Sequence, residues 1–177
     1  MSLQLPTQSF PNGPIITTAS WCSIGMELRA TGSGAVSTAW GTGNKCLYVP
    51  FWLSKPFQVV KLLAHNGSAV NGNLDIGVFD ADGNAVIGIA AAAQTGTNVW
   101  QEFDVTDQWL QPEMYFWGIQ NTGTTGTIMM WASLVHSATA GVLEELKADA
   151  NLPTTATFAK LTAAGAPLVG MSNRTLI

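Results

Sequence analysis

The hydrophobic pattern of this chain is clearest between residues 73 and 105. Apolar residues alternate with polar or small ones through 74–78, a period of two that is typical of a strand with one buried face. Asp82 and Gly83 then supply the residue types that a tight hairpin turn prefers. The alternation resumes through 99–105 after a second turn. The pattern predicts antiparallel strands joined by short turns.

Other segments repeat this pattern along the chain. β-Branched or apolar runs of strand length predict further strands at residues 15–24, 46–53, 57–65, 113–120 and 127–134. Closely spaced strands with turn residues between them, and almost no helix, predict an all-β fold. We expect an antiparallel β-sandwich of the jelly-roll type.

Both ends of the chain differ from this central region. Residues 1–14 are rich in proline and predict an extended N-terminal arm. Residues 141–148, with the sequence GVLEELKA, predict the one short helix, and extended coil is expected after it. We therefore expect a sandwich domain over residues 15–137 and a C-terminal extension over residues 138–177.

Some predicted strands are apolar on both faces, most clearly 113–120. Large exposed apolar patches are rare on monomers, so one face is expected to contact another subunit. The candidate interface residues are Met114, Tyr115, Phe116, Trp117, Met129, Trp131, Phe158 and Leu168.

Composition supports a covered surface. Charged residues make up 10% of the chain, against about 25% in a typical soluble domain, and there are seven tryptophans and six methionines. Interface cores are poor in charge and rich in aromatics and methionine. Cys22 and Cys46 are predicted to be free thiols, because a reducing compartment disfavours disulfides.

The charge pattern excludes two kinds of partner. The net charge is −4 and the seven basic residues are scattered singly, which argues against nucleic-acid binding. No apolar run is long enough to span a membrane, so no membrane partner is expected. The N-terminal sequence lacks the features of a signal peptide, which predicts synthesis in a cytoplasm without export by that route.

The densest group of side-chain oxygens is formed by Asp75, Asp80, Asp82 and Asn84, and the last three are a weak candidate for a calcium site. The spacing argues against it, since the glycine is fourth in the run rather than sixth. Ala91 also stands where a calcium loop carries its bidentate glutamate. A solvated hairpin turn is the favoured interpretation, and no metal or other cofactor is expected.

Catalytic candidates are few. His65 and His136 are the only histidines, and both are expected at strand ends. Glu102 and Asp104 share a strand face, where a polar surface is a commoner explanation than a glycosidase pair. No serine-nucleophile elbow occurs. We therefore expect no catalytic residue and no enzymatic activity.

Tryptophan offers a different hypothesis, because exposed indole rings stack against sugar rings. Trp100 alternates out of phase with Val99 and Phe103, which predicts that it faces away from the core. It is the candidate glycan-binding residue. Packing in the core or at a subunit interface is the favoured interpretation for most of the seven tryptophans.

Three segments together carry a resemblance to a known family: GNLDIGVFD at 72–80, WQEFDV at 100–105 and PEMYF at 112–116. They resemble a jelly-roll-like domain of tailed-bacteriophage virion proteins, and the resemblance covers about residues 46–134. It implies a structural module of the kind found in head decoration proteins, head fibres and tail components. The family's third strand usually ends in a Gly-Tyr-Tyr-like sequence, which residues 113–116 replace here.

These considerations lead to an expected function. The chain is expected to be a non-enzymatic virion protein, made in the host cytoplasm, that decorates or cements a capsid and anchors through its two arms. Its partners would be major capsid or tail subunits, and it would form a homotrimer or another small closed oligomer. The alternative is a tail or fibre module that binds a host surface glycan. An enzyme acting on cell-wall polysaccharide is a remote third class.

Overall fold

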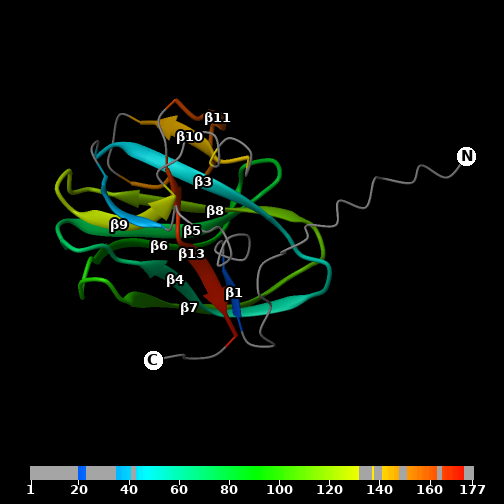
Figure 1. Ribbon diagram of the computed structural model, residues 1–177. Coiled ribbons are helices and arrows are strands. Elements are labelled where there is room, and N and C mark those ends of the chain that lie inside the picture. The colour runs from blue at the N-terminus through cyan, green and yellow to red at the C-terminus, as the bar shows by residue number, and fades with distance from the viewer. Residues whose placement is uncertain are drawn as a thin grey trace, which may run out of the picture.

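A computed structural model of the chain describes residues 20–22, 35–40, 43–131, 137, 141–147, 151–162 and 165–173. The predicted arm at residues 1–14 lies outside these residues. Figure 1 shows the arrangement of the strands, which are β1 (Ser20–Cys22), β2 (Val36–Ala39), β3 (Lys45–Trp52), β4 (Phe57–His65), β5 (Asn73–Asp80), β6 (Ala85–Ala93), β7 (Trp100–Leu110), β8 (Met114–Asn121), β9 (Thr127–Trp131), β10 (Leu143–Leu146), β11 (Ala159–Lys160), β12 (Ala166–Pro167) and β13 (Val169–Ser172).

Strands β2 to β9 pair as a set of nested hairpins. β5 pairs with β6, β4 with β7, β3 with β8 and β2 with β9, and every pair is antiparallel. β8 also pairs with β5, which gives the order β3-β8-β5-β6 within one sheet. β4 and β7 lie in a four-stranded sheet (β1-β13-β4-β7), and β2 and β9 lie in a three-stranded sheet (β12-β9-β2). Nested antiparallel pairing of this kind is the topology of a jelly roll, so the predicted all-β antiparallel sandwich is confirmed.

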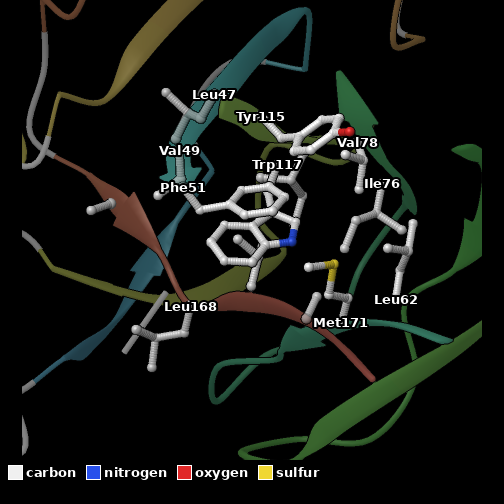
Figure 2. Close-up of a cluster of buried hydrophobic side chains, with 14 of the residues drawn as sticks. Leu47, Val49, Phe51, Leu62, Ile76, Val78, Tyr115, Trp117, Leu168 and Met171 are labelled. Atoms are coloured by element: carbon white, nitrogen blue, oxygen red, sulfur yellow. The ribbon is translucent and has the colours of Figure 1, made fainter. Parts of the chain in front are cut away.

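The main hydrophobic core lies between two layers: the six-stranded sheet on one side, and the four- and three-stranded sheets on the other. The six-stranded sheet (β11-β10-β3-β8-β5-β6) contributes an aromatic stack in which the Phe51 and Trp117 rings lie 3.9 Å apart, centroid to centroid (Figure 2). Tyr115 stacks on the other side of Phe51 at 5.6 Å. Leu62 of β4 and Met171 of β13 belong to the same buried cluster. Large interlocking rings hold the two layers together.

The C-terminal strands β12 and β13 insert between β9 and β4 of the jelly roll, and we call residues 166–172 the wedge. At one end, β4 and β9 approach directly, through a bridge between Asn66 and Ile128. Further along, β12 pairs with β9 and β13 pairs with β4. Leu168 joins both neighbours, because its N–H donates to the Met129 carbonyl and its carbonyl accepts from the His65 N–H. The expectation of coil in this part of the chain is therefore wrong.

The predicted helix is also wrong within the described part of residues 141–148. Leu143–Leu146 forms β10, which lies between β3 and β11 in the sheet. Leu, Glu and Lys favour helix locally, but the intrinsic preference is small beside tertiary contacts. Two such contacts hold the strand: Glu144 forms a salt bridge with Lys45 at 3.1 Å, and the Tyr48 hydroxyl donates to Glu145 at 2.7 Å.

The C-terminal segment also covers the outer face of the six-stranded sheet. Phe158 packs on Tyr48 and Phe116 with ring centroids 5.1 and 4.4 Å away. The buried Asp75 carboxylate accepts a hydrogen bond from the Leu152 N–H at 3.0 Å. We call residues 151–162 the covering segment. Because it belongs to the same chain, this apolar face needs no second subunit to bury it.

A row of glycines lies beside the aromatic side chains of this sheet. Gly118, Gly77 and Gly88 are paired across β8, β5 and β6. A methyl group at Gly118 would overlap the ring of Phe79. At Gly88 the nearest atom would be 4.0 Å away, so the row is open at the β6 edge.

Candidate functional site

The acidic turn between β5 and β6 is held by hydrogen bonds among its own residues. The Asp80 carboxylate accepts hydrogen bonds from the Asn84 backbone N–H, at 2.8 Å, and from the Asn84 side-chain amide. Gly83 has a φ of +86° and its N–H donates to the Asp80 carbonyl. Asp82 is exposed. Among the residues that the structure describes, no group of three or more His, Cys, Asp or Glu side chains is placed to hold a metal ion. The oxygens of this turn shape the hairpin.

The catalytic candidates have structural contacts. The His65 Nδ1 lies 2.8 Å from the Asn66 carbonyl oxygen, and its ring packs edge-on against Trp100. Asp104 forms a salt bridge with Lys61 at 2.9 Å on the outer face of the β4–β7 pair. Glu102 is half-buried on the same strand. His136 lies outside the described residues. These contacts account for the positions of His65 and Asp104 without a reaction.

The predicted interface residues lie mostly inside the chain. Met114 is 38% exposed, and Met129 and Phe158 are half-buried. The other five are buried: Tyr115, Phe116, Trp117, Trp131 and Leu168. The assignment assumed a bare apolar face, and that reason does not hold, because the core and the covering segment enclose these side chains.

Trp100, the predicted glycan-binding residue, is half-buried rather than turned away from the core. Its strand position is paired with His65, and the two rings lie 5.0 Å apart. The indole also packs against the main core cluster. The expectation that it faces away from the core is therefore wrong, since the neighbouring strand supplies a side chain that covers it.

Among the tryptophans whose side chains the structure describes, two are exposed, and the first of these forms an apolar corner. Trp52 is 58% exposed and is paired with Met114 across β3 and β8. A hydrogen bond from the Leu53 N–H to the Glu113 carbonyl, 3.0 Å long, fixes the two connections beside them. Beneath, the Tyr115 hydroxyl donates to the Glu113 carboxylate at 2.6 Å, and burial raises the pKa of Tyr115 to about 12. We call Trp52 and Met114 the Trp52 corner.

The Trp52 corner continues the apolar outer face of the six-stranded sheet. Cys46, Tyr48 and Trp52 occupy alternate positions of β3 and so point to the same side. Cys46 is a buried free thiol that donates to Gln120, and burial raises its pKa to about 12. The covering segment reaches Tyr48 through Phe158 but leaves Trp52 exposed.

The second exposed tryptophan, Trp109, has polar neighbours. It is 59% exposed near the end of β7 and is paired with Gln58 of β4. The Gln58 side-chain amide donates to the Asp107 carboxylate at 3.4 Å, so Gln58 and Asp107 lie on the same outer face. We call Gln58, Asp107 and Trp109 the Trp109 corner.

The opposite end of the sandwich is closed by a buried amide network that the sequence did not reveal. The Asn66 side-chain amide donates to the Thr95 carbonyl and to Gln101 at 2.6 and 2.9 Å. Gln94 donates to the Asn66 side chain and accepts from Asn121. Only the Asn-Gly pairs at 66–67 and 71–72 marked this region, as turns. Because the buried amides bond to one another and to the loops, the network joins the connections at this end.

No protein-family model, curated protein or solved structure matches this chain. Among the residues described here, no helix is long and apolar enough to cross a bilayer. The two exposed tryptophan corners are therefore the features from which a function can be argued.

Proposed function

We propose that this chain is a non-enzymatic structural protein of a tailed-phage virion, most specifically a capsid decoration or cement protein. The jelly roll agrees with the fold that the resemblance of residues 72–116 implies. The low charge of the chain suits a subunit whose surface meets other subunits.

The observation that carries this proposal is the Trp52 corner. Trp52 and Met114 are adjacent, exposed and continuous with a face that is otherwise covered by polypeptide. Tryptophan is among the residue types that dominate binding energy at protein interfaces. A capsid neighbour that extends the cover from Tyr48 to Trp52 would bury both side chains.

The anchoring role of the two arms changes accordingly. β10, β12 and β13 belong to the sheets of the domain, so the extension at 138–177 contributes to the fold as well as to any anchor. The proposal therefore assigns docking to the Trp52 corner and to the N-terminal residues 1–14, with assembly into a small closed oligomer such as a homotrimer.

A cosedimentation experiment tests the proposal. Capsids that lack this protein are mixed with the full-length chain, and bound protein is quantified after pelleting. Trp52→Ala is expected to weaken binding about tenfold or more, because the anchor side chain is lost. Trp109→Ala, which removes an equally exposed indole, is the matched control and is expected to bind normally. Labelled particles imaged by electron microscopy then distinguish head from tail.

Two results contradict the proposal: no association of the wild-type chain with particles, or equal binding by wild type and Trp52→Ala. The second candidate function, a tail or fibre module that binds a host glycan, is favoured by the Trp109 corner. Label at the tail tip, with binding that depends on Trp109 and not on Trp52, would support that alternative.

A further inference from the structure

The Trp109 corner exists because β7 changes phase along its length. Phe103 and Val105 pack against the core, as does Leu110, although a regular strand would turn Leu110 to the other side. The register shift between Val59 and Lys61 of β4 reverses the alternation. Leu110 therefore enters the core and Trp109 faces outward. An irregularity that re-aims side chains in this way is a common device beside binding sites.

The neighbours of Trp109 are hydrogen-bonding groups. The Gln58 side-chain amide has N–H donors and a carbonyl acceptor, and the Asp107 carboxylate has acceptors only. Their mutual hydrogen bond, at 3.4 Å, is long, so both groups keep capacity for a ligand. Thr106 and Gln108 are also exposed. β7 is the last strand of its sheet.

The size and polarity of this surface argue against a protein partner. A tryptophan side chain offers about 150–250 Å² to a contact, whereas a stable protein interface buries about 800 Å² per partner. No other large apolar side chain adjoins Trp109 in its strand pairing, in contrast to the adjacent Trp52 and Met114. One ring bordered by an amide and a carboxylate has the dimensions of a contact with a single sugar ring.

We propose that the Trp109 corner binds a saccharide. The apolar C–H face of a pyranose stacks on the Trp109 indole, and its hydroxyl groups donate to Asp107 and exchange hydrogen bonds with Gln58. No cation is paired with Asp107 among the described residues, since Lys61 bonds to Asp104. The site therefore selects neutral sugars, such as hexoses or N-acetylhexosamines, and rejects acidic ones. This activity does not depend on a virion role.

Calorimetric titration of the full-length chain tests the proposal. The probes are linear hexasaccharides of glucose, N-acetylglucosamine, mannose and galactose, with a galacturonic acid hexamer as the acidic comparison. At least one neutral probe is expected to bind with a dissociation constant of about 1 mM or lower, and the acidic probe more weakly. Trp109→Ala is expected to raise the dissociation constant about tenfold or more.

Matched variants separate the corner from general effects. Trp52→Ala removes an indole of equal exposure and is expected to leave binding unchanged. Asp107→Asn keeps the shape of the side chain and is expected to weaken binding about threefold or more, because a charged acceptor is lost. Thermal melting of each variant confirms that it is folded. The proposal is overturned if no neutral probe binds at about 10 mM, if Trp109→Ala binds like wild type, or if Trp52→Ala weakens binding as much.

Discussion

The two outer faces of this sandwich differ in what covers them. The outer face of the six-stranded sheet is aromatic, with Tyr48 and Phe116 beneath Phe158 of the covering segment. The outer face of β4 and β7 is polar, and it carries the Lys61–Asp104 pair, of which Asp104 is exposed, and the Trp109 corner. An apolar face has to be buried, and here the same chain meets most of that requirement. The uncovered parts, at Trp52 and Trp109, are where partners are expected.

The largest expected effect comes from removing the cover. A chain that lacks residues 148–177 loses β11, β12 and β13 and exposes the aromatic face. We expect loss of cooperative folding, because the wedge between β4 and β9 and part of the core disappear together. Circular dichroism melting measures this. Trp109→Ala, on the open face, is the control and should change stability by less than about 0.5 kcal/mol. A truncated chain that melts cooperatively like wild type would refute the assigned role of the cover.

Two lysine–carboxylate pairs allow a matched comparison of the faces. The two lysine side chains are similarly covered, 16% exposed for Lys45 and 17% for Lys61, but the carboxylates differ: Glu144 is 5% exposed and Asp104 is 79% exposed. Glu144→Gln should cost about 3 kcal/mol, because both charges of the pair that it breaks are shielded from solvent. Asp104→Asn should cost less than about 1 kcal/mol. Urea unfolding measures both, and equal losses would contradict the comparison.

Acid provides a second measurement on the same variant. Burial alone would raise the pKa of Glu144, but hydrogen bonds from Thr162 and Lys45 together with the Lys45 charge lower it below the ordinary 4.5. A carboxyl whose pKa is lowered by folding stabilises the fold above its unfolded pKa, and this contribution is lost as the pH falls. The stability difference between wild type and Glu144→Gln should therefore shrink below pH 4.5. A difference that stays constant down to acid unfolding would argue against this linkage.

The smallest expected effect separates two positions of the glycine row. Gly118→Ala should cost about 2 kcal/mol, since the methyl group would overlap the Phe79 ring beneath the cover. Gly88→Ala, at the open end, should be neutral or should stabilise by about 0.5 kcal/mol through the unfolded state. Thermal melts of the two variants make the test, and equal destabilisation would mean that the Phe79 ring does not constrain Gly118.

Local patterns predicted most of the strands that pair within the roll, but not β2, which lies in a glycine- and serine-rich stretch that is typical of a loop. The hairpin of β5 and β6 was readable because its alternation and its turn residues are adjacent in sequence. β10 was missed because Leu-Glu-Glu-Leu favours helix until Lys45 and Tyr48 hold its carboxylates. β12 and β13 were missed because they are short, and the gap that they fill is created by distant strands.

The exposed sites were harder to predict than the fold. Continuing the alternation of Phe103 and Val105 places Trp109 on the core side, and only the register shift beside Val59 reverses this. Trp100 was misplaced for a related reason, since its exposure depends on His65 across the sheet. In both cases the orientation is set by the partner strand, which a single sequence does not specify.

The wedge has a consequence for how the protein is made. The strands of the nested hairpins all precede β12 and β13 along the chain, yet β13 separates β4 from β1 and fills part of the core. During synthesis the earlier strands emerge with this slot empty and its strand edges open. The jelly roll can close only after residues 166–172 have been synthesised, so the edges of β4 and β9 stay open to other chains until then.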